Sequence, residues 1–201
     1  MKNTSLKKMI FMALLSTIGY LMMTIAFPLP LLPVFLTLDF SDIPALIGTI
    51  LFGPVSGIVI EGIKNLIHYI LNGTPTVVPV GEVANFVTGS ILIVVFNLIF
   101  KKSRTTRSLT IGMLFGTILM TILMTIANYY IIFPSYALFL GLSIDSAVAM
   151  AHSANHTIHN LFTLVILGVA PFNIVKGMIL TIIMIPLYIR LKSYFKTYAI
   201  K

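Results

Sequence analysis

Residues 43–72, IPALIGTILFGPVSGIVIEGIKNLIHYILN, form an apolar run of about 30 residues with one interruption, Gly53-Pro54. A helix that crosses a bilayer needs about 20 mostly apolar residues, so a single helix of this length would overshoot the membrane. Proline favours the first turn of a new helix. The sequence therefore predicts two membrane helices, at 43–53 and 54–72, of which the first is short for a full crossing.

The composition of the whole chain also indicates a bilayer. Of the 201 residues, 58% are hydrophobic and 9% are charged, whereas soluble chains carry about 25% charged residues. The chain has no cysteine, which excludes thiol chemistry, disulfides and cysteine–zinc sites. We expect one all-α membrane domain that spans residues 1–201.

Four further apolar runs flank the central pair and bring the predicted number of membrane helices to six. These runs are 9–27, 79–100, 109–133 and 171–191. The segment PLPLLP at 28–33 cannot be helical, so it begins an outer loop that reaches Asp42. Asn72-Gly73-Thr74-Pro75 is a turn signal, and residues 135–170 are predicted to form a long outer loop.

The basic residues indicate the orientation of these helices. Eleven of the 13 Lys and Arg residues flank apolar runs, near the N-terminus, at 101–107 and near the C-terminus. Cytoplasmic loops are enriched in Lys and Arg, and the predicted outer loops contain neither. We expect both termini in the cytoplasm and a multi-pass protein of the cell membrane. The net charge of +8 then reflects orientation in the lipid bilayer, and no nucleic-acid partner is expected.

Five polar side chains lie near the outer ends of the predicted helices: Glu82, Asn85, Asn128, Asn173 and Lys176. At 1.5 Å per residue, all fall within roughly 3–9 Å of those ends. Polar groups inside a membrane are costly and are functional hypotheses. They predict a cup that opens outward and suits a neutral, partly aromatic metabolite better than an ion; hydrogen bonding between helices is the alternative. No acid lies three or four residues from Lys176, so its partner is on another helix or is a ligand.

Three other polar groups have competing interpretations. Glu61, Lys64, Asn65 and His68 share one helix face and favour a structural ion pair. Asp39 and Asp42 could bind magnesium in a membrane enzyme, but Asp42 precedes an apolar run and fits a helix N-cap better. His152, His156 and His159 could bind a metal, yet a polar face at the membrane interface is favoured.

Several strings of the sequence, in order along nearly the whole chain, resemble the riboflavin-binding S component of energy-coupling factor (ECF) transporters. They are LDFSDIPALIGTILFGPVSG (38–57), EGIKNLIHYILNG (61–73), VPVGEVANFVTGS (78–90), ILMTIANYYIIFPSY (122–136) and APFNIVKGMI (170–179). The resemblance implies a six-helix S-component fold that captures riboflavin from outside. It also implies two kinds of partner, a transmembrane coupling (T) subunit and two cytoplasmic ATPase subunits.

The resemblance further assigns roles to single residues. It implies that Asn128, Asn173 and Lys176 hold the polar edge of the isoalloxazine ring, and that Glu82 and Asn85 meet ring or ribityl groups. Leu38, Asp39 and Phe40 would belong to a covering loop. The family's docking motif on the first helix is Ala-x-x-x-Ala, whereas here Ala13 is followed by Thr17.

No catalysis is expected, and no cofactor apart from riboflavin as the transported ligand. An S component for another vitamin or for a metal ion, and a stand-alone small-metabolite carrier, remain alternatives.

Overall fold

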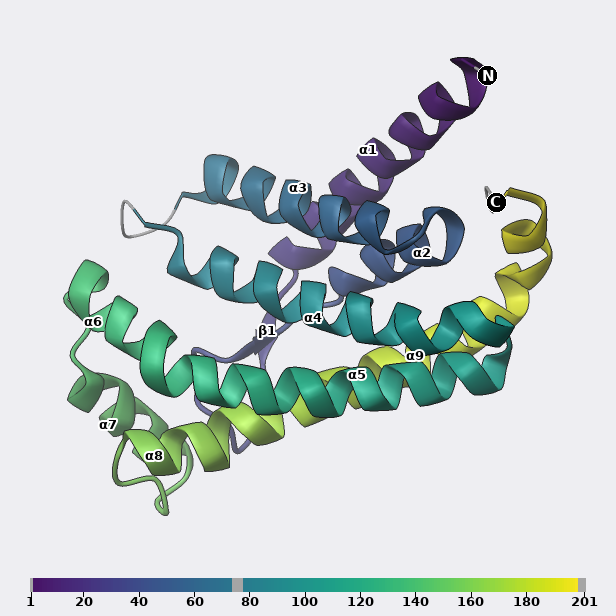
Figure 1. Cartoon of the computed structure of the whole chain (residues 1–201). Helices are drawn as coiled ribbons and strands as arrows, with labels where there is room; N and C mark the ends of the chain where they lie inside the picture. The colour runs from purple at the N-terminus through teal and green to yellow at the C-terminus, as the bar shows by residue number, and fades with distance from the viewer. Residues whose placement is uncertain (1, 74–77, 199–201) are drawn as a thin grey trace.

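The computed structural model describes residues 2–73 and 78–198 and is mostly helical (Figure 1). The first half contains α1 (Lys2–Thr24), β1 (Phe27–Pro28), β2 (Thr37–Leu38), α2 (Asp42–Phe52) and α3 (Pro54–Asn72). The second half contains α4 (Val80–Ser103), α5 (Thr106–Ala127), η1 (Asn128–Ile132), α6 (Phe133–Leu140), α7 (Ile144–Ala154), α8 (Leu161–Leu164), η2 (Val165–Val169) and α9 (Ala170–Tyr198). The turn predicted at 72–75 falls largely outside the described residues.

The helices pack in two connected groups. Helix α3 lies against α1, α2 and α4, while α5 lies against both α4 and α9. One hydrophobic core runs through α2, α3, α4, α5 and α9. Helices α6, α7 and α8 gather at the end of the molecule opposite the chain termini (Figure 1). These contacts give the molecule an elongated form, with its polar ends far apart.

The predicted break at Gly53-Pro54 is confirmed. Helix α2 ends at Phe52, α3 begins at Pro54, and Gly53 between them has φ +91° and ψ 172°. Residues other than glycine are essentially excluded from this backbone region. The dipeptide therefore separates α2 from α3 because glycine supplies the turn and proline starts the next helix.

Exchanging Gly53 for alanine should lower the free energy of unfolding by about 1–3 kcal/mol, because the side chain strains this backbone conformation. No atom lies within 4 Å of the added Cβ, so a clash is not involved. Thermal unfolding in detergent measures the effect. Gly62→Ala is the matched control: it lies inside α3, where the added Cβ meets only Phe86 at 3.6 Å. A loss no larger than that of Gly62→Ala would contradict the backbone explanation.

Two proline-marked helix boundaries are corrected. The helix predicted to end at 133 continues through η1 and α6 to Leu140, and the one predicted to begin at 171 starts at Leu161. A π-helical turn precedes Pro134 and Pro171 in each case, with hydrogen bonds from Phe133 to Asn128 and from Ala170 to Val165. Because a proline ring crowds the carbonyl four residues back, a widened turn accommodates it and the helix continues.

The predicted loop at 135–170 is therefore largely helical. It contains the end of α6, all of α7 and the whole of α8 and η2. These elements share a small second core of Phe133, Ala147, Ala151, Ile158, Leu164, Val165 and Val169. Burial of these apolar side chains holds α7 against its neighbours, which is why the segment folds as a helical unit.

The first outer segment also differs from the prediction. Helix α1 ends at Thr24 rather than 27, and Phe27–Pro28 pairs antiparallel with Thr37–Leu38. The residue before a proline avoids helical backbone, so Phe27 adopts the extended form. The segment predicted as a plain loop thus contains a two-stranded hairpin.

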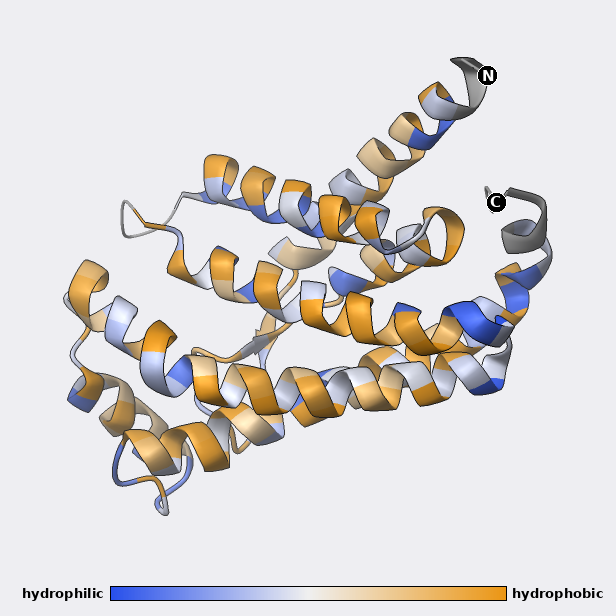
Figure 2. Cartoon of the chain, viewed as in Figure 1, coloured by the Kyte–Doolittle hydropathy of each residue, from blue (hydrophilic) through white to orange (hydrophobic). Residues whose placement is uncertain are grey.

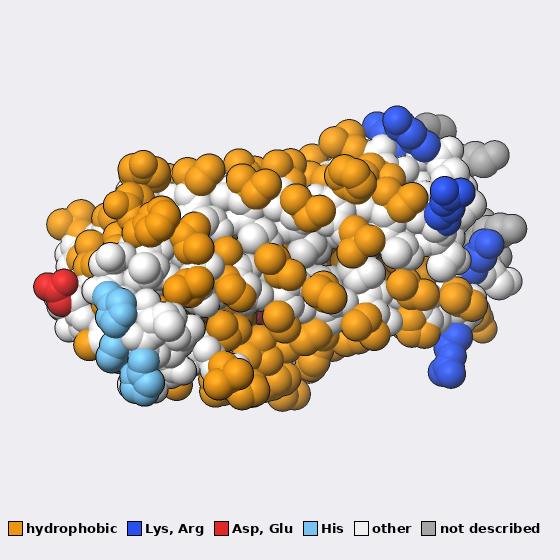
Figure 3. Space-filling view, turned by 90° about the horizontal axis from the view of Figure 1, so that it is seen from below, with side chains coloured by type: hydrophobic (Ala, Val, Ile, Leu, Met, Phe, Trp, Pro, Cys, Tyr) orange, Lys and Arg blue, Asp and Glu red, His pale blue; other side chains and the backbone are white. Residues whose placement is uncertain are grey.

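The surface supports a membrane location. Among the described residues, four helices are long and apolar enough to cross a membrane: Ser5–Thr24, Val80–Ser103, Thr106–Leu140 and Leu161–Tyr194. Apolar residues run along these helices (Figure 2). Lys and Arg side chains gather at one end of the molecule, whereas imidazole and carboxylate groups lie at the other (Figure 3). Helix α2 is apolar but shorter, and α3 carries Glu61 and Lys64, so six full crossings remain a prediction.

Candidate functional site

A cavity of about 440 Å³ lies among α4, α5–η1–α6, α9 and the first outer segment. Six of the eight ligand-binding residues predicted from the sequence line it: Asp39, Glu82, Asn85, Asn128, Asn173 and Lys176. The structure therefore brings the polar residues that were predicted near the outer helix ends together around one cavity. Most of the remaining wall is apolar.

Two amide side chains face this cavity from adjacent helices, where the π-helical turns lie. Asn128 begins η1 and its Nδ2 donates to the Met124 carbonyl at 2.8 Å. The Nδ2 of Asn173 donates to the Val169 carbonyl at 3.0 Å, at the end of η2. Because the Nδ2 group of each amide is bonded to its own helix, Oδ1 is the atom that can accept a hydrogen bond from a ligand in the cavity.

Lys176 supplies the cationic group of the cavity wall. Its Nζ lies 3.0 Å from Asp42 Oδ2 and 3.9 Å from Asp39 Oδ2. The sequence left its partner open, as another helix or a ligand. The structure identifies acids of the first outer segment and of the start of α2.

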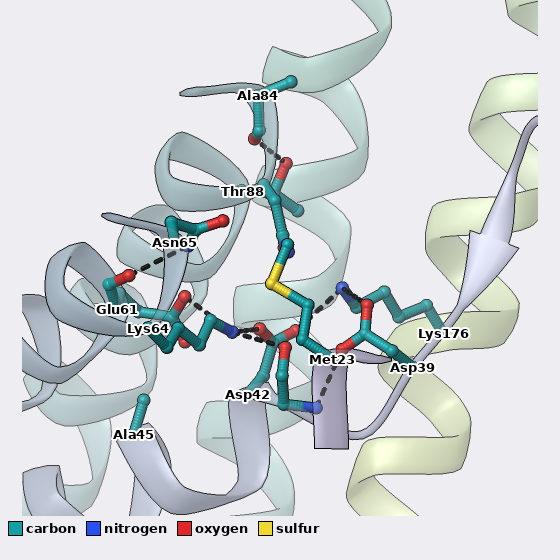
Figure 4. Close-up of polar contacts among 12 residues, drawn as sticks. Met23, Asp39, Asp42, Ala45, Glu61, Lys64, Asn65, Ala84, Thr88 and Lys176 are labelled. Carbon is teal, nitrogen blue, oxygen red and sulfur yellow. Dashed lines mark hydrogen bonds and ion pairs between the residues drawn. The ribbon is translucent and has the colours of Figure 1, made fainter. Parts of the chain in front are cut away.

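A buried ionic cluster continues from Lys176 into the protein (Figure 4). The Nζ of Lys64 lies 2.6 Å from Asp42 Oδ1, 2.8 Å from Glu61 Oε2 and 2.6 Å from Ser41 Oγ. The side chains of Lys64 and Glu61 are fully buried. The structural ion pair predicted on α3 is thus confirmed, and Asp42 joins it to Lys176.

The predicted capping role of Asp42 is wrong. Ser41 is the N-cap residue of α2, and no side chain caps this helix. The Asp42 carboxylate instead pairs with two lysines, because ion pairing offsets the cost of burying a charge. Asp39 accepts a hydrogen bond from the Ser41 amide at 2.8 Å. Two acids held this way do not form an open magnesium site, which removes the support for the enzyme alternative.

Further polar residues of the cavity come from α3 and α4. Glu82 Oε1 lies 3.1 Å from His68 Nδ1, and Asn85 Nδ2 lies 3.7 Å from Met23 Sδ. His68 also lines the cavity. The sequence analysis placed His68 on the polar face of α3 but not in the site; its position one turn beyond Lys64, toward the outer end, was the available signal.

Leu38 and Phe40 do not line the cavity. Successive side chains of an extended segment point to opposite sides, so Thr37 and Asp39 face the cavity while Leu38 is 1% exposed in the interior. Phe40 packs against the main core and near Phe27. The aromatic wall is made instead by Phe35, Phe133, Tyr136 and Phe172.

Two further predictions concern surface residues. Ala13 and Thr17 are exposed on α1, and the Thr17 hydroxyl donates to the Ala13 carbonyl at 3.0 Å. Across residues 2–73 and 78–198, no group of three or more His, Asp or Glu side chains is placed to hold a metal ion. The metal interpretation of His152, His156 and His159 is therefore not supported. His152 Nδ1 donates to the Ile158 carbonyl at 2.8 Å, and its ring packs against the other two.

Comparisons with known proteins point to one family for this chain. The family model "ECF transporter, substrate-specific component" matches residues 7–188. The chain is 40% identical over 188 residues to the riboflavin transporter FmnP of Bacillus subtilis (strain 168), covering 94% of this chain and 93% of that protein. It is 40% identical over 190 residues to the riboflavin transporter RibU of Staphylococcus aureus (strain TCH60), with the same coverage.

The fold matches a solved structure as well. A chain described under "Structure and mechanism of the S component of a bacterial ECF transporter" superposes with a TM-score of 0.75 at 36% sequence identity. The match covers 96% of this chain and 99% of that one. Since sequence, family model and fold agree over nearly the whole length, this chain belongs to the family of ECF transporter substrate-specific (S) components.

Proposed function

We propose that this chain is the riboflavin-binding S component of an ECF-type importer and not an enzyme. The observation that carries the proposal is the cavity itself, where two amide oxygens and one ammonium group from η1 and α9 meet an aromatic wall. The riboflavin transporters at 40% identity support the same ligand. A flavin combines an apolar ring system with a polar edge, and this cavity offers apolar and polar surfaces that suit both.

The donors and acceptors of the wall match the pyrimidine edge of the isoalloxazine ring. That edge presents a carbonyl, an N–H and a second carbonyl. One of the two Oδ1 atoms, of Asn128 or Asn173, accepts from the single N–H and Lys176 donates to a carbonyl, while the other Oδ1 accepts from a ribityl hydroxyl. Glu82 and Asn85, on the α4 side, accept from and donate to ribityl hydroxyls. Asp39 lines the cavity from the first outer segment, whereas its neighbours Leu38 and Phe40 pack into the interior.

The membrane arrangement that fits this role has six helices and both termini in the cytoplasm of a bacterial cell. The cluster of Lys and Arg at the end of the molecule that holds the termini supports this orientation. The cavity then opens to the outside. Release to the inside needs a T subunit and two ATPases, and the exposed pair Ala13 and Thr17 on α1 is the proposed docking position.

Titration of the purified chain with riboflavin tests the proposal. We expect saturable quenching of flavin fluorescence with one riboflavin per chain, and yellow protein when cells are grown with the vitamin. Thiamine and biotin are ring-containing vitamins of a different shape. They serve as control ligands and should not compete with riboflavin for the cavity. Absence of quenching, or binding of one of these vitamins in place of riboflavin, would contradict the proposal. ATP-independent uptake by vesicles that contain this chain alone would favour the carrier alternative.

A further inference from the structure

Asp42 lies behind the cavity wall and bridges two lysines. It does not line the cavity, and it is 1% exposed. Its Oδ1 binds Lys64 at 2.6 Å and its Oδ2 binds Lys176 at 3.0 Å. Figure 4 shows the carboxylate between the two ammonium groups. One acid therefore orients the cationic group of the cavity from behind.

In this position, the Lys176 ammonium keeps N–H groups whose hydrogen bonds a ligand can accept. An ammonium group has three N–H bonds. Asp42 forms an ion pair with this ammonium at 3.0 Å, whereas Asp39, at 3.9 Å, is too far for a hydrogen bond. Since Lys176 lines the cavity, a donor remains for a ligand that enters it.

Asp42 is itself held rigidly. Lys64, its second partner, is fully buried and also contacts Glu61 and Ser41. Helix α1 closes this cluster at Gly19, where an added Cβ would lie 3.3 Å from Lys64 Cδ. The position of the Lys176 ammonium is thus set by residues of α1, α2 and α3 that do not line the cavity.

We propose that Asp42 is a positioning residue for flavin binding, which acts through Lys176 by fixing its ammonium and balancing its charge. The inference rests on the proposed riboflavin function. With only the more distant Asp39 to balance its charge, the ammonium beside the ring would favour the negatively charged reduced flavin. Loss of the Asp42 charge should therefore raise the reduction potential of the bound flavin as well as weaken its binding.

A double-mutant cycle on the full chain in detergent, with riboflavin as the probe, tests this role. Asp42→Asn leaves Lys64 with Glu61 and Lys176 with Asp39, so each lysine keeps an acid. We expect Asp42→Asn to raise the riboflavin Kd about tenfold and Lys176→Met to raise it about 30-fold. Adding Asp42→Asn to Lys176→Met should then change the Kd by less than about twofold, because the path through Lys176 is already broken.

The potential of the bound flavin provides the second readout. It should rise in Asp42→Asn and should not rise when the same exchange is made in Lys176→Met. Asp145→Asn, the same exchange on an exposed residue of α7, controls for the loss of one negative charge. Should Asp42→Asn fail to fold, Asp42→Glu replaces it in the Kd cycle, since it displaces the carboxylate by one methylene; because it keeps the charge, the potential should then stay unchanged.

Additive effects of the two exchanges on Kd, or an unchanged Kd in Asp42→Asn, would overturn the positioning role. Failure of the unmodified protein to bind riboflavin would instead overturn the proposed function.

Discussion

Exchanging Asn128 and Asn173 together for leucine should weaken riboflavin binding by about 10²- to 10⁴-fold. Each amide oxygen faces the cavity, and losing one hydrogen bond to a buried polar group costs about 1–3 kcal/mol. Leucine has the same branching at Cγ as asparagine but is larger, so the exchange removes the acceptors and narrows the cavity. The helix backbone keeps its hydrogen bonds, because the backbone N–H of residue 128 still donates to the Met124 and Thr125 carbonyls.

Fluorescence titration of the single and double variants measures this effect. The matched control is Asn97→Leu, which makes the same exchange in membrane helix α4 at a residue that does not line the cavity. We expect its Kd to stay within about twofold of the original. Equal losses in Asn97→Leu and in the Asn128→Leu/Asn173→Leu double variant would mean that helix packing, and not ligand contact, explains the change.

The parts of the structure that the sequence predicts well depend on local chemistry. Gly53-Pro54 separates α2 from α3 because backbone rules act on neighbouring residues alone. Asn128, Asn173 and Lys176 surround one cavity because the depth of a residue in a membrane helix follows from counting along the chain. Both inferences need no knowledge of which helices are neighbours.

The parts that were missed depend on contacts between distant segments. Asp42 was assigned to a helix cap because its neighbours along the chain fit one, yet its partners Lys64 and Lys176 are 22 and 134 positions away. The helix at 109–133 was predicted to end before Pro134, because the π-helical turn that accommodates this proline has no simple sequence signal. Tertiary contacts decided the case of Asp42, and tertiary packing also places α7 on its own small core.

Exchanging Lys64 for methionine should lower the free energy of unfolding by about 3–5 kcal/mol, since it leaves buried acids without their partner. Glu61 would lose its ion pair, and Asp42 would keep only Lys176. Denaturant unfolding in detergent micelles measures the loss. Lys101→Met, the same exchange at an exposed residue, is the control and should change stability by less than about 0.5 kcal/mol.

Removing a charge from each side of the pair separates the ionic effect from the packing effect. Methionine keeps most of the apolar stem that Lys64 packs against Gly19, so the stem contact survives in every variant. Because Glu61→Gln removes one of the orphaned charges, the variant Glu61→Gln/Lys64→Met should recover part of the stability that Lys64→Met loses. If Glu61→Gln lowers the stability of Lys64→Met by as much as it lowers that of the original chain, the two charges act independently. The cluster then does not stabilise the fold as a unit.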